Sequence, residues 1–372
     1  MKKFEKPIMV TQSFLPPIEE YKEQIDRIWE NNWVTNQGPI HKEFNKCITK
    51  YLKVNNSTLF VNGHLALDVA IKALNLKGEV ITTPFTFAST THAIKMNGVK
   101  PVFCDINVED YTIDVSKIER LITKETSAII PVHVFGTPCD VEGLQKIAEK
   151  YKLKIIYDAA HIFGVEVNGV GIGNFGDVSM FSLHATKVFN SIEGGVLTYN
   201  NLDYKRQFDL LKNFGITDPE TVEAVGLNAK MNEFQAAMGL VNLRYIDEEI
   251  NKRKKVVKKY RECLKDIQGI TYLKDKIGIR HNYAYFPILV DEIEYGKTRN
   301  DLFKKLKEHN VFARKYFYPL VNEYDCYKND YNVEDTPVAK YVGDRVLTLP
   351  MYGSLELDKV ENICEIIKQF SK

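Results

Sequence analysis

The sequence lacks a net charge of either sign. Of its 372 residues, 50 are Lys or Arg and 49 are Asp or Glu, so the formal charge at pH 7 is +1. A nearly neutral protein has no long-range field that attracts polyanions, which argues against nucleic acid or an anionic membrane as partner. Any anion that the protein binds must therefore be held by local groups.

Long hydrophobic runs and paired cysteines are missing as well. No segment approaches the roughly 20 apolar residues that a membrane-spanning helix needs. Glu5, Lys6 and Pro7 stand where a signal peptide would have an unbroken apolar core. No CxxC pair occurs among the six cysteines, which favours a reducing compartment, and we predict a cytoplasmic location. These cysteines are Cys47, Cys104, Cys139, Cys263, Cys326 and Cys364.

Motifs of several catalytic classes are absent or out of context. Neither HExxH nor a Cys/His cluster occurs among the eight histidines, so we expect no metal site. Ser182 and His184 lie two residues apart, but no GxSxG elbow surrounds them, which argues against a hydrolase. The GxGxxG match at 171–176 precedes a strand-like segment instead of opening a helix, so we predict a turn there.

The sequence does contain a regular alternation of strand-like and helix-like segments. Runs that are apolar on both faces and separated by helices are typical of a largely parallel sheet buried between helical layers. We therefore predict an α/β fold with seven strands. These strands are expected at 57–62, 79–83, 101–106, 127–136, 154–160, 177–183 and 194–199.

The pattern changes after Met231. Residues 232–267 are mostly helix formers with only Gly239 as an internal breaker, which predicts one long helix linking two domains. The remainder mixes strands and helices, as in a smaller α+β domain. We place the boundary near residue 245, giving a large domain at 1–245 and a small one at 246–372. The basic run at 252–259 is predicted to be the solvated face of the helix.

One lysine occupies an unexpectedly apolar position. Lys187 is the only residue with a formal charge between Asp177 and Glu193. Asp158 ends the apolar run 154–157, which puts a carboxylate at the edge of the sheet where ligands of open α/β folds bind. A buried carboxylate needs a cation or several donors, although a helix cap is the alternative role for Asp158.

A phosphate site is indicated by the segment Asn62-Gly63-His64, which joins a predicted strand to a predicted helix. The free N–H groups and positive end of a helix bind a small anion without any net protein charge. Ser182, five residues before the lysine, adds a hydroxyl.

Together these parts are the ones needed to hold pyridoxal phosphate. Lys187 would bond to the aldehyde and move protons, and Asp158 would keep the ring nitrogen protonated. An aromatic side chain from 84–90 would pack on the ring. A lysine buried beside a cationic ring should have a lowered pKa, which makes it a usable base near neutral pH.

At these residues the sequence resembles the DegT/DnrJ/StrS family of nucleotide-sugar aminotransferases, and the resemblance covers nearly the whole chain. It is carried most specifically by DAAH at 158–161, FSLHATK at 181–187 and EGG at 193–195. The resemblance implies a fold-type-I pyridoxal-phosphate-dependent transferase. Its large domain would hold a mostly parallel seven-stranded sheet between helices, followed by a smaller C-terminal α+β domain.

The resemblance also implies roles around the cofactor ring. Lys187 would be the catalytic lysine and Asp158 the partner of the pyridine nitrogen. Phe87 would stack on the ring. His161 stands where many members carry glutamine, close to the ring hydroxyl, and both side chains can donate a hydrogen bond there.

Further roles concern the phosphate and the substrate. Gly63, His64 and Ser182 would hold the phosphate, although members commonly have threonine in place of His64. Asn228 matches a residue that reaches the phosphate of the neighbouring subunit, which implies a homodimer. Lys230 would contact the nucleotide diphosphate.

The implied reaction transfers an amino group from glutamate, through pyridoxamine phosphate, to a dTDP-linked keto-6-deoxyhexose for bacterial surface polysaccharides. We favour carbon 3 of the sugar, with carbon 4 of dTDP-4-keto-6-deoxyglucose as the alternative. A sugar dehydratase fits poorly because Lys187 is retained, and a cofactor-binding regulator without turnover stays open. Val321 stands where many relatives have histidine, so we assign no substrate role there.

Overall fold

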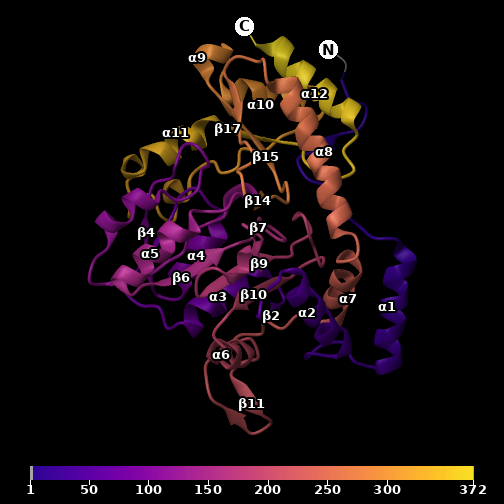
Figure 1. The fold of residues 1–372 in the computed structure, drawn as a ribbon, viewed down its shortest axis with the longest axis vertical. Coiled ribbons are helices and arrows are strands. Elements are labelled where there is room, and N and C mark those ends of the chain that lie inside the picture. The colour runs from indigo at the N-terminus through magenta and orange to yellow at the C-terminus, as the bar shows by residue number, and fades with distance from the viewer. Residues whose placement is uncertain (1–2, 372) are drawn as a thin grey trace.

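The computed structural model describes residues 3–371, and a seven-stranded sheet forms its centre (Figure 1). All neighbouring strands are parallel except that β10 runs antiparallel to both β2 and β9. The prediction of a mostly parallel seven-stranded sheet is therefore confirmed. In spatial order the strands are β2 (Asn56–Phe60), β10 (Gly195–Tyr199), β9 (Val178–Ser182), β6 (Lys154–Asp158), β5 (Thr126–Ile129), β3 (Glu79–Thr82) and β4 (Lys100–Phe103).

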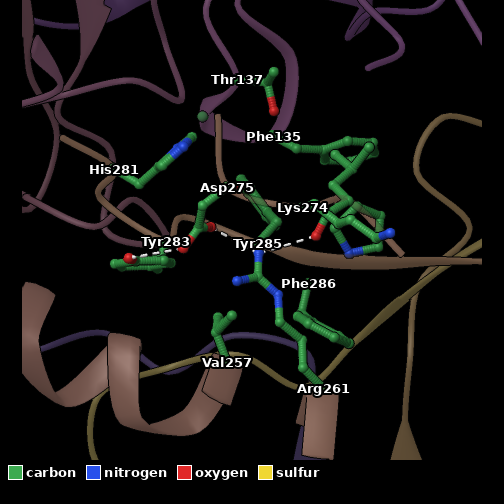
Figure 2. Close-up of a pocket in the computed structure, with 13 residues that line it drawn as sticks. Phe135, Thr137, Val257, Arg261, Lys274, Asp275, His281, Tyr283, Tyr285 and Phe286 are labelled. Carbon is green, nitrogen blue, oxygen red and sulfur yellow. Dashed lines mark hydrogen bonds and ion pairs between the residues drawn. The ribbon is translucent and has the colours of Figure 1, made fainter. Parts of the chain in front are cut away.

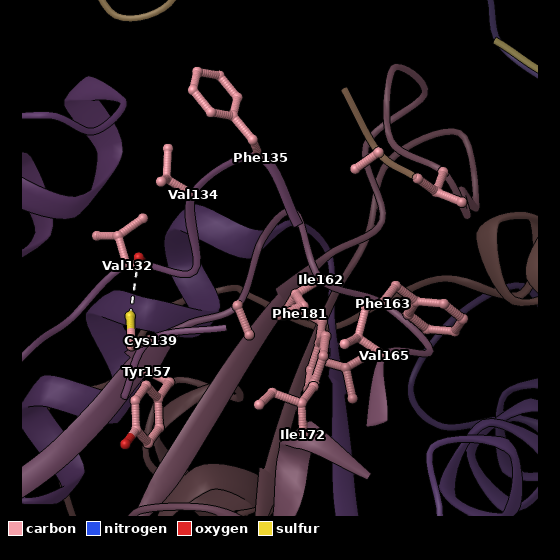
Figure 3. Packing of buried hydrophobic residues seen from close by; sticks show 14 of the residues in the cluster. Val132, Val134, Phe135, Cys139, Tyr157, Ile162, Phe163, Val165, Ile172 and Phe181 are labelled. Carbon is pink, nitrogen blue, oxygen red and sulfur yellow. Dashed lines mark hydrogen bonds between the residues drawn. The ribbon is translucent and has the colours of Figure 1, made fainter. Parts of the chain in front are cut away.

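Both faces of this sheet are buried, because successive residues of one strand enter different apolar clusters. Ile155 packs in one cluster and Ile156 in another, and both are nearly inaccessible to solvent. Figure 3 shows part of the first cluster, where Phe163 and Phe181 lie near Ile162. The helices that pack on the sheet are α2 (Pro39–Tyr51), α3 (Gly63–Ala73), α4 (Ala88–Met96), α5 (Val141–Tyr151) and α6 (Asp203–Leu211). Helix α1 (Ile18–Asn31) lies farther out and packs on α7 (Glu233–Asn242).

The prediction of one long helix after Met231 is wrong. Two helices occur instead, α7 (Glu233–Asn242) and α8 (Ile246–Leu264). The first packs on α1 and α2, whereas the second packs on α12 (Leu357–Phe370), so the chain changes direction between them. The buried Asn242 side chain donates to the Asn190 carbonyl at 2.9 Å and holds the end of α7. The proposed boundary at residue 245 coincides with this break and stays a prediction.

The C-terminal part builds its own core. An antiparallel sheet of β13 (Ile270–Tyr272), β15 (Phe286–Val290) and β17 (Val346–Leu349) is covered by α8, α12 and α10 (Arg299–Glu308). Strand β1 (Ile8–Met9) pairs with β16 (Val311–Phe312), so the N-terminal segment joins this core. The smaller elements are β7 (Glu166–Val167), β8 (Val170–Gly171), β14 (Ile279–Arg280), α9 (Glu292–Tyr295) and α11 (Pro337–Arg345).

Three further sequence predictions meet the structure here. The GxGxxG segment is a turn that leads directly into β9, as predicted. The basic run 252–259 mostly faces solvent, but Arg253 is buried and donates to the carbonyls of Ala284 and Met351. Across residues 3–371, no helix has both the length and the apolar character that crossing a bilayer would need.

We predict that the contact between α7 and α2 makes Gly239 essential. A Cβ atom at residue 239 would lie 2.7 Å from Cε1 of Phe44, which is fully buried. Gly239→Ala should therefore lower the free energy of unfolding by about 1–3 kcal/mol, as overpacking does, instead of raising it by about 0.5–1 kcal/mol as in an open helix. Urea denaturation of the cofactor-free protein measures this difference.

The double variant Gly239→Ala/Phe44→Leu is the matched control. If crowding is the cause, the two changes together should cost less than the sum of their separate effects. A strictly additive pair would contradict the proposed contact.

Candidate active site

Lys187 lies in the loop between β9 and β10, and the backbone holds that loop closed. The Leu183 N–H donates to the Gly194 carbonyl at 2.8 Å, and the Lys187 N–H donates to the His184 carbonyl at 2.9 Å. Val188 is buried directly behind the lysine. The predicted apolar surroundings are therefore present, and burial lowers the pKa of the Lys187 ammonium.

Asp158 is the last residue of β6, and its carboxylate is only 4% exposed. Its Oδ2 accepts from the Thr90 hydroxyl at 2.7 Å, and its Oδ1 accepts from the Ala160 N–H at 3.1 Å. No helix begins after it, so the alternative role as a helix cap is excluded. Burial raises the pKa of Asp158, while the Thr90 bond, the Ala160 bond and the charge of Lys187 act in the opposite direction.

The Asp158 carboxylate has no formal counter-ion. Among residues 3–371, no Lys, Arg or His nitrogen lies within 4 Å of its oxygens, although Lys187 is close enough to influence its pKa. A buried carboxylate with two donors and no cation is costly unless a positively charged group occupies the adjoining space. The site is thus suited to a ligand with a protonated nitrogen.

His161 lies beside the same two residues, and its ring position is fixed. Its Nδ1 accepts from the Phe135 N–H at 3.2 Å, which leaves the proton of the neutral ring on Nε2. The ring packs against Tyr285 with centroids 4.8 Å apart and is stacked parallel to Phe317. Burial, with the nearby Lys187 charge, holds the pKa of His161 well below its ordinary value. The imidazole is therefore a neutral donor near pH 7.

The start of α3 is where the sequence predicts an anion site. The Asn62 side chain caps the helix by accepting from the Leu65 N–H at 2.8 Å, while the N–H groups of Gly63 and His64 find no acceptor in the described part of the chain. A Cβ atom on Gly63 would lie 3.1 Å from that of Ser182, so the end of β9 reaches the helix start. The structure brings these three predicted residues together.

Two predicted residues have more specific surroundings than the sequence indicated. The His64 Nδ1 atom lies 2.9 Å from the Ser89 hydroxyl, so His64 offers an anion its backbone N–H while its ring is engaged elsewhere. Phe87 is the N-cap of α4, three residues before the Thr90 that bonds to Asp158, and its side chain is 52% exposed. An aromatic face is therefore available at the rim of the site.

Asn228 and Lys230 form a separate pair. The Lys230 ammonium donates to Asn228 Oδ1 at 2.9 Å and lies 4.9 Å from the centre of the Phe214 ring. Asn228 is exposed, and no hydrogen bond or ion pair within residues 3–371 joins either side chain to Lys187. The intervening Ala229 carbonyl accepts from the Val61 N–H, so the pair lies near the strand that leads to α3.

Sequence reasoning missed Thr90, Arg314 and Tyr316. The Arg314 guanidinium lies 4.1 Å from the centre of the Tyr316 ring, and both side chains influence the pKa of Lys187. Their only sequence signal is the aromatic and basic segment before Val321, which is too short to specify a site. Val321 itself is fully buried.

A small cavity adjoins the site but cannot hold a cofactor. Phe135 and Tyr285, which contact His161, also line a space of about 40 Å³ near Arg261 and Asp275 (Figure 2). That volume is close to the share of about 30 Å³ that one water molecule takes in liquid water. The Arg261 guanidinium donates to Asp275 Oδ1 at 2.7 Å and to the Leu273 carbonyl at 3.0 Å, whereas its buried Nε has no partner among residues 3–371.

Comparison with known proteins agrees with this geometry. The profile of the DegT/DnrJ/EryC1/StrS aminotransferase family matches residues 17–368. The dTDP-4-amino-4,6-dideoxy-D-glucose transaminase of Shigella dysenteriae is 44% identical over 365 residues, covering 98% of this chain and 99% of the relative. The Escherichia coli transaminase of the same name is 43% identical over 366 residues, covering 98% of both chains.

Solved structures agree as well. The structure of DesI in the presence of its TDP-sugar product matches with a TM-score of 0.95 and 31% identity, covering 99% of this chain and 94% of that one.

We predict that Thr90 limits the pKa of Asp158. Thr90→Val removes a hydroxyl that stabilises the charged carboxylate, so the pKa of Asp158 should rise further. The cost to folding should be about 1.5–3 kcal/mol where the carboxylate is ionised. It should shrink as the pH falls through the pKa of Asp158, because the protonated group depends less on the bond. Denaturation of the cofactor-free protein across the acidic pH range measures both effects.

Thr91 provides the matched control. Its side chain is also fully buried, but its hydroxyl has no hydrogen-bond partner. Thr91→Val should leave the pH dependence of stability unchanged. Equal pH dependence in the two valine variants would show that the Thr90 bond is not responsible.

Proposed function

Because this chain belongs to the DegT/DnrJ/EryC1/StrS aminotransferase family, we propose that it transfers an amino group from glutamate to carbon 4 of dTDP-4-keto-6-deoxyglucose. The observation that carries the proposal is the meeting of Lys187, a buried Asp158 without a counter-ion, and the free N–H groups at the start of α3. The chain is an enzyme, a nucleotide-sugar aminotransferase. The sugar carbon, the donor and the cofactor are parts of the proposal.

We now favour carbon 4 of the sugar as the position of amination, whereas the sequence alone favoured carbon 3. The two relatives at 44% and 43% identity are both named for a product with nitrogen at carbon 4. Both align over nearly their full length, so the match is not confined to the central sheet. We therefore take the alternative from the sequence as the leading hypothesis and carbon 3 as the second candidate.

The residues present fit pyridoxal 5′-phosphate. The Asp158 carboxylate would accept a hydrogen bond from the protonated ring nitrogen, whose positive charge supplies the missing cation. The N–H groups of Gly63 and His64, with the Ser182 hydroxyl, would hold the phosphate. When bound, this cofactor supplies an aldehyde on an electron-accepting ring, and it alternates with pyridoxamine phosphate during amino transfer.

Two further side chains would complete the contacts to the ring. Phe87 would pack against its face, and the His161 Nε2 proton would be donated to the ring oxygen. Because His161 stays neutral, it orients the ring without adding a positive charge next to Lys187.

Lys187 would act as the base that moves a proton to and from the substrate carbon. Burial disfavours its charged form and lowers its pKa, which makes the free amine more accessible than in an exposed lysine. The carboxylate of Asp158 partly opposes this effect, whereas the Arg314 guanidinium adds to it. The pKa of Lys187 is therefore lower than that of an exposed lysine, but higher than it would be without the Asp158 carboxylate.

We further propose a homodimer, in which Asn228 reaches the phosphate of the neighbouring subunit and Lys230 contacts the nucleotide diphosphate. The hairpin of β11 (Ile216–Asp218) and β12 (Thr221–Val222) projects from the body of the chain (Figure 1). Next to the Asn228 pair, Phe214 is 48% exposed and Val225 is 81% exposed. Apolar side chains exposed together on a projecting segment support a protein contact there.

A cytoplasmic location belongs to the same proposal. All six cysteines are free thiols, which suits a reducing compartment.

Product analysis tests the proposed reaction. With glutamate and dTDP-4-keto-6-deoxyglucose, the holoenzyme should release one 2-oxoglutarate per sugar converted, and NMR should locate the new amine at carbon 4. Lys187→Ala should reduce the rate by roughly 10²- to 10⁴-fold, because the proton-transfer group is lost.

The rival functions give different results in that assay. If the enzyme instead aminates a dTDP-linked 3-keto-6-deoxyhexose at carbon 3, the carbon-3 hypothesis is correct. A dehydrated product without nitrogen would indicate a dehydratase, and cofactor binding without turnover on any keto sugar would indicate a regulator.

A second prediction concerns His161. If it acts as a neutral donor, His161→Gln should keep kcat within a few-fold, whereas His161→Leu should lose roughly tenfold or more, since a hydrogen bond to a charged group is lost. Because the pKa of His161 lies well below its ordinary value, the wild-type and glutamine enzymes should share one pH–rate profile between about pH 6 and 8. An inflection in that range present only with histidine would contradict the neutral role.

A further inference from the structure

A second polar cavity lies at the free edge of the central sheet. It has a volume of about 180 Å³ and is lined by residues of α2, β2 and α6. Strand β2 is the edge strand, and the cavity borders its residues Ser57 and Thr58. The anion site described above begins at Gly63, beyond the opposite end of β2, so the two sites are distinct.

Basic side chains dominate this cavity. Lys42, Lys205 and Lys212 line it together with a single carboxylate, Asp209. Lys212 is only 2% exposed, and its ammonium lies 2.7 Å from Asp209 Oδ1. The Lys205 ammonium lies 2.5 Å from the other oxygen of Asp209. Lys205 and Lys212 share this one carboxylate, whereas Lys42 and Lys205 are exposed at the mouth of the cavity. The lining therefore carries two more ammonium groups than carboxylates.

The cavity also contains an unpartnered imidazole. His41 is 5% exposed, and its Nδ1 atom is buried without a hydrogen-bond partner. Its Nε2 atom makes no hydrogen bond to any residue in 3–371 either. The N–H groups of Ile40 and His41 at the start of α2 are already bonded to the Glu233 carboxylate, so the helix terminus is not the source of the site. The ring nitrogens of His41 therefore have no partner among residues 3–371 and can bond to a ligand.

We propose that this cavity binds a phosphate dianion, either free orthophosphate or the phosphate of a small monoester. A phosphate offers several acceptor oxygens, whereas the lysine and imidazole groups around it mostly offer donors. Water is the alternative content, but water carries no charge that would pair with the lysines that line the cavity. The volume exceeds the roughly 150 Å³ of an engineered cavity that holds benzene, so there is room for phosphate with a small organic group.

Calorimetric titration of the holoenzyme with inorganic phosphate tests the site directly. All variants should carry Lys230→Met, which removes the proposed diphosphate contact, and bound cofactor blocks the site at α3. One phosphate per chain should then bind. Lys212→Met should weaken binding at least tenfold, because it removes the most buried positive charge.

Asp209→Asn gives the opposite expectation. It removes the only carboxylate among the lining residues and releases both lysines, so phosphate binding should tighten several-fold. General destabilisation cannot produce shifts of opposite sign at two paired residues. Lys150→Met is the surface control, since Lys150 pairs with Glu119 far from the cavity and should leave the affinity unchanged.

A parallel titration with glycerol 2-phosphate distinguishes the two sources of the ligand. Tighter binding of orthophosphate identifies free phosphate as the ligand, and tighter binding of glycerol 2-phosphate identifies a monoester. Absence of binding by both, or binding that is unaffected by Lys212→Met and Asp209→Asn, overturns the proposal.

Discussion

The carboxylate at the end of β6 is the constraint around which the site is built. Asp158 is buried with two donors and no cation, and this arrangement is stable only because its neighbours are fixed by the sheet and by α4. Its backbone N–H donates to the Pro131 carbonyl and its carbonyl accepts from the His133 N–H, so both bonds run to the segment that follows β5. The carboxylate therefore cannot turn toward water. A ligand that carries a positive charge would offset the free-energy cost of burying it.

The chain topology places an anion site at a set distance from that carboxylate. Parallel strands end at one edge of a sheet, and the helix that follows β2 starts at the same edge. The antiparallel β10 must then pass close to the helix start, where a Cβ atom on Gly195 would lie 2.8 Å from the Gly63 nitrogen. The glycine pair 194–195 is thus required for close backbone packing, which leaves the N–H groups of α3 open to a ligand.

Much of this could be predicted from the sequence because the signals are local. Alternating apolar runs identified the strands, and Lys187 and Asp158 are conspicuous as single charges in apolar surroundings. Thr90 could not be predicted, because threonines are common and only the packing of α4 brings this one to Asp158. The break between α7 and α8 was missed for a similar reason. Its residues are good helix formers, and tertiary contacts such as the one from Asn242 redirect the chain.

The two anion sites show two ways in which a protein of nearly zero net charge concentrates positive potential. At α3 the potential comes from backbone N–H groups, which need no lysine and leave the adjoining carboxylate undisturbed. At the edge of β2 it would come from ammonium groups, and there Asp209 pairs with Lys205 and Lys212 and offsets part of their charge. A lysine cluster beside Asp158 would compete with the ligand for that carboxylate. Backbone dipoles at the active site avoid this competition, which explains why Lys187 remains the only lysine in that loop.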